Sequence, residues 1–168
     1  MDLLITSDDL YKLIKKRDNT IVIDARSFSE YKDGHIPGAI NIDLFQLHWF
    51  DTTKRGIKDF NRQTRLLLSN IGIRNDNKVI FYDNFSGVNS ARGVWLLLYF
   101  SHKKVCILDG GFQKWKSENL PVEVKSNQLT NVRFVGKPNY KVIADADQVK
   151  KSIGNKDVKI VDARSKEE

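Results

Sequence analysis

Residues 78–100 read KVIFYDNFSGVNSARGVWLLLYF, and this stretch decides the fold class. Its first five residues, 78–82, are rich in β-branched and aromatic side chains and predict a buried strand. A polar loop over 83–89 follows, and Ser90 then caps a predicted helix that opens at Ala91. A strand, a polar loop and a helix in this order are typical of one unit of a parallel sheet.

The alternation of strands and helices continues on both sides of this unit. The pattern predicts a helix from Ser7, a strand over 21–23, a short helix over 27–32, a strand near 41–42, a helix over 59–71, a strand over 105–108 and a helix over 112–118. Crossover connections of this kind place helices on both faces of the sheet. The sequence therefore predicts an α/β fold with a central parallel sheet and a site beyond the carboxyl ends of its strands.

An internal repeat indicates a duplicated domain. Residues 160–165, IVDARS, echo residues 22–27, VIDARS, so that Asp162 falls 138 positions after Asp24. A period of this length corresponds to a whole domain and not to a solenoid unit. We therefore expect a first domain over 1–124, a polar linker over 125–138 and the truncated start of a second domain over 139–168.

The start of a second domain raises a packing problem. Residues 140–168 supply one helix and an apolar strand over 159–161, but not the neighbouring strands of a sheet. An unpaired apolar strand is an association hazard. We expect residues 140–168 to be disordered, docked on the first domain or paired with a second molecule.

The 168 residues include one cysteine, and their net charge is +7. The longest apolar run, 94–100, is far shorter than the ~20 residues of a membrane-spanning helix, and the N-terminus lacks a signal-peptide pattern. We therefore expect a cytoplasmic protein without a membrane partner. The basic residues occur in small groups interleaved with acids, which favours an ordinary solvated surface over nucleic-acid binding. The net positive charge leaves a weak attraction for small anions.

The histidines and the cysteine lack the spacing of metal ligands, and no glycine-rich phosphate loop occurs in the sequence. We therefore expect neither a metal ion nor a cofactor. Cys106 lies in the middle of the predicted strand over 105–108, where no loop or helix terminus would stabilise a thiolate. We expect it to be a small buried apolar side chain and not a nucleophile.

Residues 31–42, YKDGHIPGAINI, resemble the signature of the rhodanese family, an aromatic residue followed by His-Ile-Pro-Gly-Ala. Three further blocks resemble the family in the same order, over 22–26, 82–95 and 108–115. Together with the repeat, they resemble the N-terminal half of a two-domain thiosulfate or 3-mercaptopyruvate sulfurtransferase. The resemblance implies a rhodanese-like domain in this chain. For the intact protein it implies sulfurtransferase activity.

The resemblance also implies the chemistry. Enzymes of this family carry sulfane sulfur as a cysteine persulfide and move it from a small anionic donor, thiosulfate or 3-mercaptopyruvate, to cyanide or a thiol. The family cysteine opens the loop after a central strand, where this chain has Asp83. Since a carboxylate cannot form a persulfide, the resemblance implies a non-catalytic first copy and a catalytic cysteine in its partner, the second domain. We expect no catalytic residue in this chain and no activity from it alone.

Other polar residues are candidates for supporting roles. His48, Asp51 and Arg92 are candidates for contacts with the substrate or the second domain. For His48 and Asp51, packing within their loop is an equal alternative, and for Arg92 we favour a contact that ties the loop to Asp83 or Asp109. Six residues are expected to have structural roles at turns and strand ends: Asp24, Arg26, His35, Gly38, Asp109 and Gly110.

Two alternatives differ from the leading hypothesis. The chain could be a non-catalytic rhodanese module for regulation or protein binding, with Asp83 selected in place of the cysteine. The start of a second copy at 139–168 argues against that module. The second alternative is a phosphatase-like relative of the rhodanese fold. It also needs a loop cysteine, and this chain has Asp83 at that position, so we reject it.

Overall fold

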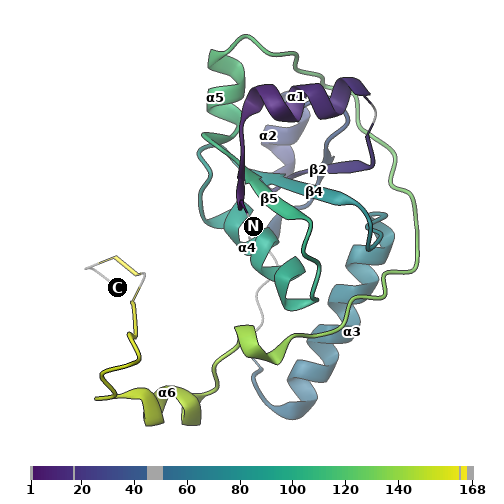
Figure 1. The fold of residues 1–168 in the computed structure, drawn as a ribbon. Coiled ribbons are helices and arrows are strands. Elements are labelled where there is room, and N and C mark those ends of the chain that lie inside the picture. The colour runs from purple at the N-terminus through teal and green to yellow at the C-terminus, as the bar shows by residue number, and fades with distance from the viewer. Residues whose placement is uncertain (1, 17, 45–50, 163, 166–168) are drawn as a thin grey trace.

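The computed structural model describes residues 2–16, 18–44, 51–162 and 164–165. Within them, five parallel strands form one sheet in the order β1-β5-β4-β2-β3, which confirms the predicted α/β class (Figure 1). The strands are β1 Leu4–Ile5, β2 Thr20–Asp24, β3 Ile40–Asn41, β4 Lys78–Tyr82 and β5 Val105–Leu108. The helices are α1 Ser7–Lys16, α2 Phe28–Asp33, α3 Lys54–Asn70, α4 Val88–Tyr99, α5 Gly111–Ser117, the 3-10 helix η2 Tyr140–Val142 and α6 Ala146–Ser152.

The central strand β4 pairs with β2 on one side and with β5 on the other. Both β4 and β5 have the predicted bounds, because each is an apolar run with polar residues at its ends. The edge strand β1 pairs with β5 and was not predicted as a strand. It has only two residues, too few to carry a period-two pattern.

Helices cover both faces of the sheet, as the alternation predicts. Figure 1 shows α1, α2 and α5 on one face and α3 and α4 on the other. Leu10, Phe112 and Trp115 pack on the first face, and Leu68 and Leu97 pack on the second. Two apolar layers, one on each face, thus hold the strand ends in fixed positions.

Helix starts differ from the predicted ones where side chains decide them. The helix predicted over 59–71 begins five residues earlier, because the Thr53 hydroxyl accepts a hydrogen bond from the Gly56 N–H at 3.1 Å. The prediction of Ser90 as a cap was wrong. Helix α4 begins at Val88, and the Ser90 hydroxyl lies inside its first turn.

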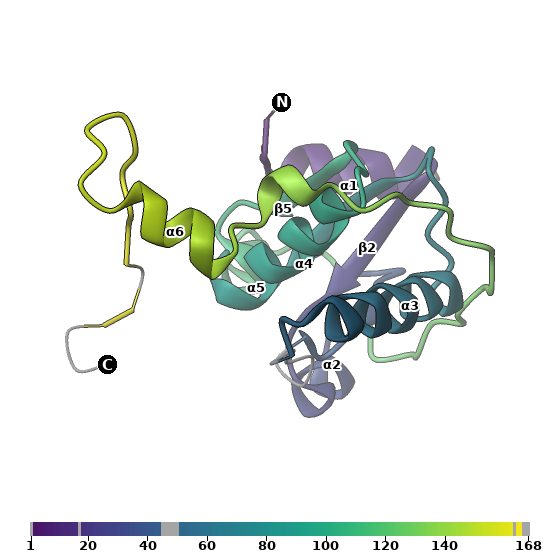
Figure 2. The ribbon, with the colours of Figure 1, turned by 90° about the horizontal axis from the view of Figure 1, so that it is seen from below.

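The segment 125–138 packs against the sheet domain along its length. Figure 2 shows it passing around one end of α3. The Val132 N–H donates to the Ser69 carbonyl at 2.9 Å, and the Phe134 side chain is 4% exposed within the core of the α3 and α4 face. This segment therefore completes the core on that face, although its composition is mostly polar.

The chain beyond η2 leaves the sheet domain, and α6 stands away from it in both ribbon views (Figures 1 and 2). The predicted helix forms, but the predicted strand over 159–161 does not. Ile160 and Val161 are 57% and 82% exposed. A strand needs neighbours for its backbone hydrogen bonds, and in the described part of the chain this segment has none.

Candidate functional site

The candidate site lies at the carboxyl ends of the strands. Strands β2, β4 and β5 end at Asp24, Tyr82 and Leu108, side by side in the sheet. The loop that follows β4 connects directly to α4, so that its residues lie at the N-terminus of that helix. This is the position that the strand order predicts for a site.

The Asp83 carboxylate fills the centre of this loop. One of its oxygens, Oδ1, accepts hydrogen bonds from the N–H groups of Phe85 at 3.1 Å and Gly87 at 2.7 Å. The other, Oδ2, accepts from the N–H and the hydroxyl of Ser90, both at 3.1 Å. The side chain is 7% exposed. The loop is therefore an anion cradle that is occupied by its own carboxylate.

Two opposing effects act on the pKa of Asp83. Burial raises the pKa, but the hydrogen bonds from Gly87, Ser90 and Phe85 outweigh burial and lower it overall. The side chain is therefore a carboxylate at neutral pH, and it offers no thiol to a sulfur donor.

Helix α5 holds the loop from the other side. The Phe112 N–H donates to the Asp83 carbonyl at 2.8 Å, and the Gln113 N–H donates to the Asn84 carbonyl at 3.1 Å. Gly111 has a φ of +59°, and a Cβ there would clash with the Asp83 carbonyl oxygen. Only glycine allows this close approach of helix and loop.

A buried ion pair lies beside the loop at the end of β2. Arg26 binds Asp24 through Nε at 2.9 Å and Nη2 at 2.5 Å, and the same Nη2 donates to the Gly34 carbonyl at 2.8 Å. The Tyr82 hydroxyl donates to Asp24 at 2.7 Å and accepts from the Ile36 N–H at 3.2 Å. This network ties β2, β4 and the turn before β3 together.

The ionisation of this network follows from burial and from Asp24. Burial raises the pKa of Tyr82 well above its ordinary value, and the charge of Asp24 raises it further. Burial lowers the pKa of Arg26, but the hydrogen bonds and charge of Asp24 outweigh that effect and raise it. Arg26 is therefore charged, while the Tyr82 hydroxyl is neutral and can donate to the carboxylate.

His35 and Gly38 lie in a turn that Glu123 holds, and of these three residues only His35 is buried. The His35 ring stacks on Tyr31 at 3.8 Å between centroids, and its Nδ1 lies 2.8 Å from the Tyr31 carbonyl. Backbone hydrogen bonds of 2.9 Å join His35 and Glu123 in both directions, and the Gly38 N–H donates to the Glu123 carboxylate at 2.6 Å. Gly38 has a φ of +79°, which explains a glycine there.

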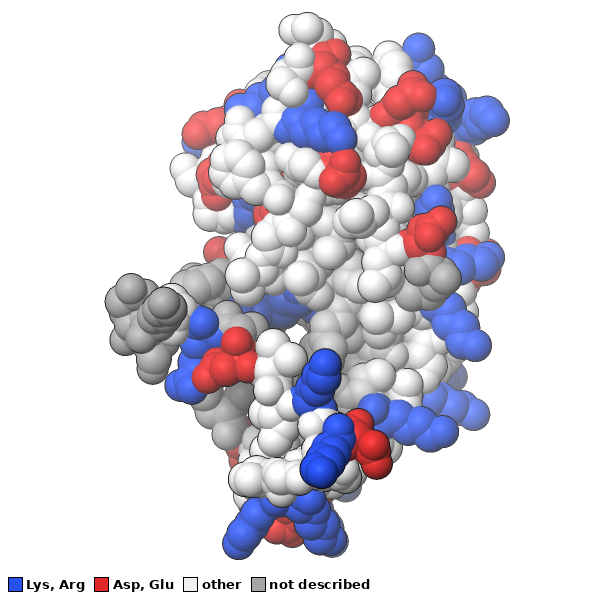
Figure 3. Space-filling model, turned by 60° about the vertical axis from the view of Figure 1, so that its left-hand side comes forward, with Lys and Arg blue, Asp and Glu red and all other residues white. Residues whose placement is uncertain are grey.

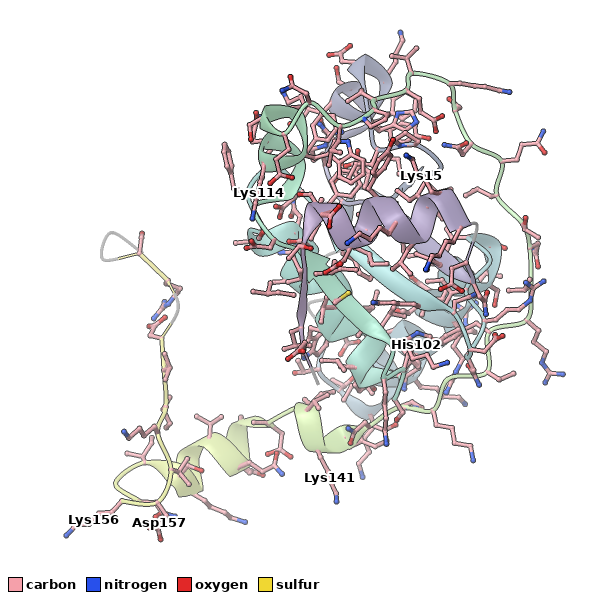
Figure 4. All side chains as sticks on the ribbon, turned by 45° about the horizontal axis from the view of Figure 1, so that its top comes forward. Lys15, His102, Lys114, Lys141, Lys156 and Asp157 are labelled. Atoms are coloured by element: carbon pink, nitrogen blue, oxygen red, sulfur yellow. The ribbon has the colours of Figure 1, made fainter. Side chains whose placement is uncertain are left out.

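Asp109 and Gly110 form the turn between β5 and α5. Gly110 has a φ of +74° and precedes the first residue of α5. Lys114 forms an ion pair with Asp109 at 2.6 Å, and Figure 4 shows Lys114 on the outer side of α5. The pair is half-exposed, so it contributes little to stability.

The prediction that Arg92 ties the loop to Asp83 or Asp109 was wrong. Its Nη1 donates instead to the Leu44 carbonyl at 2.8 Å, and the hydrogen bonds of the described residues join it to neither carboxylate. The Asp51 carboxylate accepts from the Thr53 N–H at 2.9 Å, close to the start of α3. His48 lies outside the described residues. Neither of these hydrogen bonds, of Arg92 or of Asp51, reaches the Asp83 cradle.

Cys106 is buried in β5 with 3% of its surface exposed. Burial raises the pKa of its thiol, while the charge of Lys78 opposes this shift only in part. A thiol of raised pKa is a poor nucleophile at neutral pH. In residues 2–16, 18–44, 51–162 and 164–165, no three potential ligands form a metal cluster, and no helix is long and apolar enough to cross a bilayer.

Sequence reasoning missed three residues that fix the loop. Ser90 was expected to cap a helix, but its hydroxyl donates to Asp83. Glu30 accepts from the Asn84 amide at 2.7 Å and so ties α2 to the loop. The spacing of Ser27 and Glu30, a capping box, could have indicated the start of α2 but not this long-range contact.

Known proteins resemble this chain along most of its length. The Rhodanese-like domain family matches residues 6–118. The thiosulfate/3-mercaptopyruvate sulfurtransferase 2 of Arabidopsis thaliana is 30% identical over 82% of this chain and 46% of its own length. The thiosulfate sulfurtransferase of Gallus gallus is 28% identical over 84% of this chain and 49% of its own length. The chain thus spans about half the length of these relatives.

A solved structure agrees with these relatives. The crystal structure of the 3-mercaptopyruvate sulfotransferase SseA from Escherichia coli superposes with a TM-score of 0.78 and 26% sequence identity. The superposition covers 98% of this chain and 66% of that chain. Because the family matches residues 6–118, more than half of the chain, and the fold superposes on this structure, the chain belongs to the rhodanese family.

Proposed function

We propose that this chain is the non-catalytic rhodanese domain, and the start of a second one, of a sulfurtransferase. The intact enzyme moves sulfane sulfur from thiosulfate or 3-mercaptopyruvate to cyanide or a thiol. Its nucleophile is a cysteine in the second domain. That thiolate attacks the outer sulfur of thiosulfate, the S–S bond breaks and sulfite leaves, and cyanide then removes the bound sulfur as thiocyanate.

The Asp83 carboxylate is the observation that carries this proposal. It fills a cradle of three N–H groups and one hydroxyl, at the point where the family cysteine would have to present a persulfide. A thiolate there would be stabilised by the same donors. The loop geometry thus supports the family, while the side chain supports a non-catalytic copy.

A second observation supports the duplication. Arg164 binds Asp162 through Nε at 2.9 Å and Nη2 at 2.5 Å, the same distances as in the pair of Arg26 and Asp24. Here the pair is exposed and lies outside the sheet that the described residues form. This likeness favours residues 139–168 as the start of a second domain over a single non-catalytic module.

An activity assay tests the proposal. We expect the 168-residue chain to show no thiocyanate formation from thiosulfate and cyanide, and we expect the protein extended by the codons after Glu168 to be active. The extension should supply a cysteine in a loop after a strand, and its replacement by serine should abolish turnover.

Cys106→Ser in the extended protein is the matched control, because it removes a thiol that is buried in β5. It should leave turnover unchanged within about twofold. Turnover by the short chain would contradict the proposal, whether or not it survived this substitution. A stop codon directly after Glu168 would favour the non-catalytic module instead.

A further inference from the structure

A groove of about 840 Å³ runs between α3 and residues 138–140, and none of the loop residues 83–90 lines it. One wall is α3, and the other is formed by Pro138 and Tyr140. In Figure 3, basic side chains outnumber acidic ones over the lower part of the face, the level at which Figure 1 places η2, α6 and one end of α3. The groove is therefore a second candidate site.

Four cations form a row along the α3 wall. They lie at successive spacings of four, four and three residues, which places them on one face of the helix over about 16 Å. The one acidic residue of the lining, Asp59, approaches Arg62 at 3.9 Å. The row has a net positive charge and consists of Lys54, Lys58, Arg62 and Arg65.

Two polar donors at this wall are held in place by the core. Asn61 is 6% exposed, and its Oδ1 accepts from the Tyr99 hydroxyl at 2.9 Å, while its Nδ2 has no acceptor within the described part of the chain. Arg65 donates from Nε to the Gly136 carbonyl at 3.2 Å and lies 5.3 Å from the Phe100 ring. Both side chains are oriented before any ligand arrives, which lowers the entropic cost of binding.

Apolar surface lies between these polar groups. Leu66 and Tyr140 are 58% and 60% exposed and line the groove, together with Ile57. The Tyr140 ring contacts Tyr99 edge to face, with 6.2 Å between centroids. Figure 4 shows the neighbouring side chain, Lys141, pointing away from the body into solvent.

The shape and spacing of the groove favour a peptide. Alternate side chains of an extended chain repeat every ~7 Å, close to the ~6 Å rise between cations four residues apart on a helix. A small oxyanion would fill only a fraction of the groove. Single-stranded nucleic acid needs several aromatic rings for its bases, and the lining offers only Tyr140.

We propose that this groove binds an acidic, extended segment of a protein partner. Its alternate carboxylates pair with the cation row, and one of its apolar side chains packs on Tyr140. The Asn61 amide donates to a backbone carbonyl of the segment. This proposal stands independently of the sulfurtransferase activity.

Binding of a designed peptide to the full 168-residue chain tests the proposal. The probe is a fluorescently labelled ten-residue peptide with glutamate at every second position and serine or leucine between. We expect saturable binding by fluorescence anisotropy, and at least tenfold weaker binding of the same peptide with glutamine for glutamate. Absence of saturable binding would overturn the proposal.

Matched charge variants locate the site. Lys58 and Arg62 are exposed, so Lys58→Gln with Arg62→Gln should weaken binding at least tenfold and leave the urea midpoint unchanged. Lys103→Gln with Lys104→Gln removes the same charge elsewhere and should change binding less than twofold. Equal losses in both variants would overturn the proposal. Tighter, Arg62-dependent binding of a ten-nucleotide deoxythymidine strand would assign the groove to nucleic acid and overturn it too.

Discussion

Asp83 has four donors around a buried charge, so its replacement by asparagine is a sharp test of the loop. In Asp83→Asn an amide NH2 group faces N–H donors, and hydrogen bonds to a charged acceptor are lost. We expect the free energy of unfolding to fall by about 2–4 kcal/mol at neutral pH, measured by urea denaturation. Asp109→Asn, which removes a half-exposed carboxylate, should have a much smaller effect.

The pH dependence of this loss follows from the lowered pKa of Asp83. A carboxylate whose pKa is lower in the folded state stabilises the fold above its ordinary value, 3.8. It loses that contribution as the pH falls through the folded pKa. The difference between the wild type and Asp83→Asn should therefore be full at neutral pH and shrink below about pH 4. A difference that stayed constant into strong acid would exclude the charge as its source.

Tyr82→Phe tests the buried network at high pH. The folded state raises the pKa of Tyr82, so its contribution is full below the ordinary value of 10.0 and is lost as the pH rises toward the folded pKa. The variant loses a hydroxyl bonded to Asp24 and Ile36, and we expect it to be about 1–3 kcal/mol less stable at neutral pH. The two proteins should converge in stability above pH 10.0.

At the residue scale, the sequence predicts which positions are important more reliably than it predicts the contacts that their side chains make. The short-range pair of Asp24 and Arg26 needs only the turn between them. Arg92 was assigned to Asp83 or Asp109 but reaches Leu44, 48 positions away. Such contacts depend on where whole elements pack, and no local pattern encodes that.

At the scale of elements, the approach of α5 to the loop depends on Gly111. Gly111→Ala adds a Cβ against the Asp83 carbonyl in a backbone conformation that already disfavours side chains. Gly38→Ala is the matched control, because φ is also positive there but no atom lies within 4 Å of the added Cβ. We expect Gly38→Ala to lower the free energy of unfolding by about 1–2 kcal/mol, because a residue other than glycine is disfavoured in a left-handed backbone conformation.

Gly111→Ala should cost at least about 2 kcal/mol more than this control, by urea denaturation, because steric clash adds to the same backbone penalty. If the two variants lost the same free energy of unfolding, α5 would be able to move away from the loop without destabilising the fold.

Elements with strong patterns were predicted well, and elements that depend on neighbours were not. Strands β4 and β5 are apolar runs between polar residues, and their bounds agree with the prediction. The apolar run over 159–161 has a similar pattern but forms no strand. Backbone pairing, and not side-chain pattern, decides between these two outcomes.

At the scale of the whole molecule, the segment after residue 143 contributes little to the fold. All of its described residues are exposed except Ser152, which is partly exposed. We expect deletion of residues 144–168 to change the free energy of unfolding by less than about 0.5 kcal/mol. Limited trypsin digestion should cleave first at the lysines of α6 and leave a resistant fragment that contains the whole sheet.

In contrast to residues 144–168, Phe134 should contribute strongly to the stability of the fold. It lies in a mostly polar stretch that the sequence presents as a linker, yet its ring packs edge to face on Phe100 at 5.8 Å. Phe134→Ala should cost about 3–4 kcal/mol in urea denaturation. A loss below about 1 kcal/mol would contradict the inclusion of residues 125–138 in the folded unit.

The pairing of β1 with β5 has a consequence for biosynthesis. Leu4 leaves the ribosome before its neighbour in the sheet, Ile107, which is made more than a hundred residues later. Until then β5, the strand on which β1 docks, does not exist, and the exposed Leu3 and Leu4 at the N-terminus must wait unpaired. Strand β1 is thus translated early but paired late, and the sheet cannot close until β5 has been made.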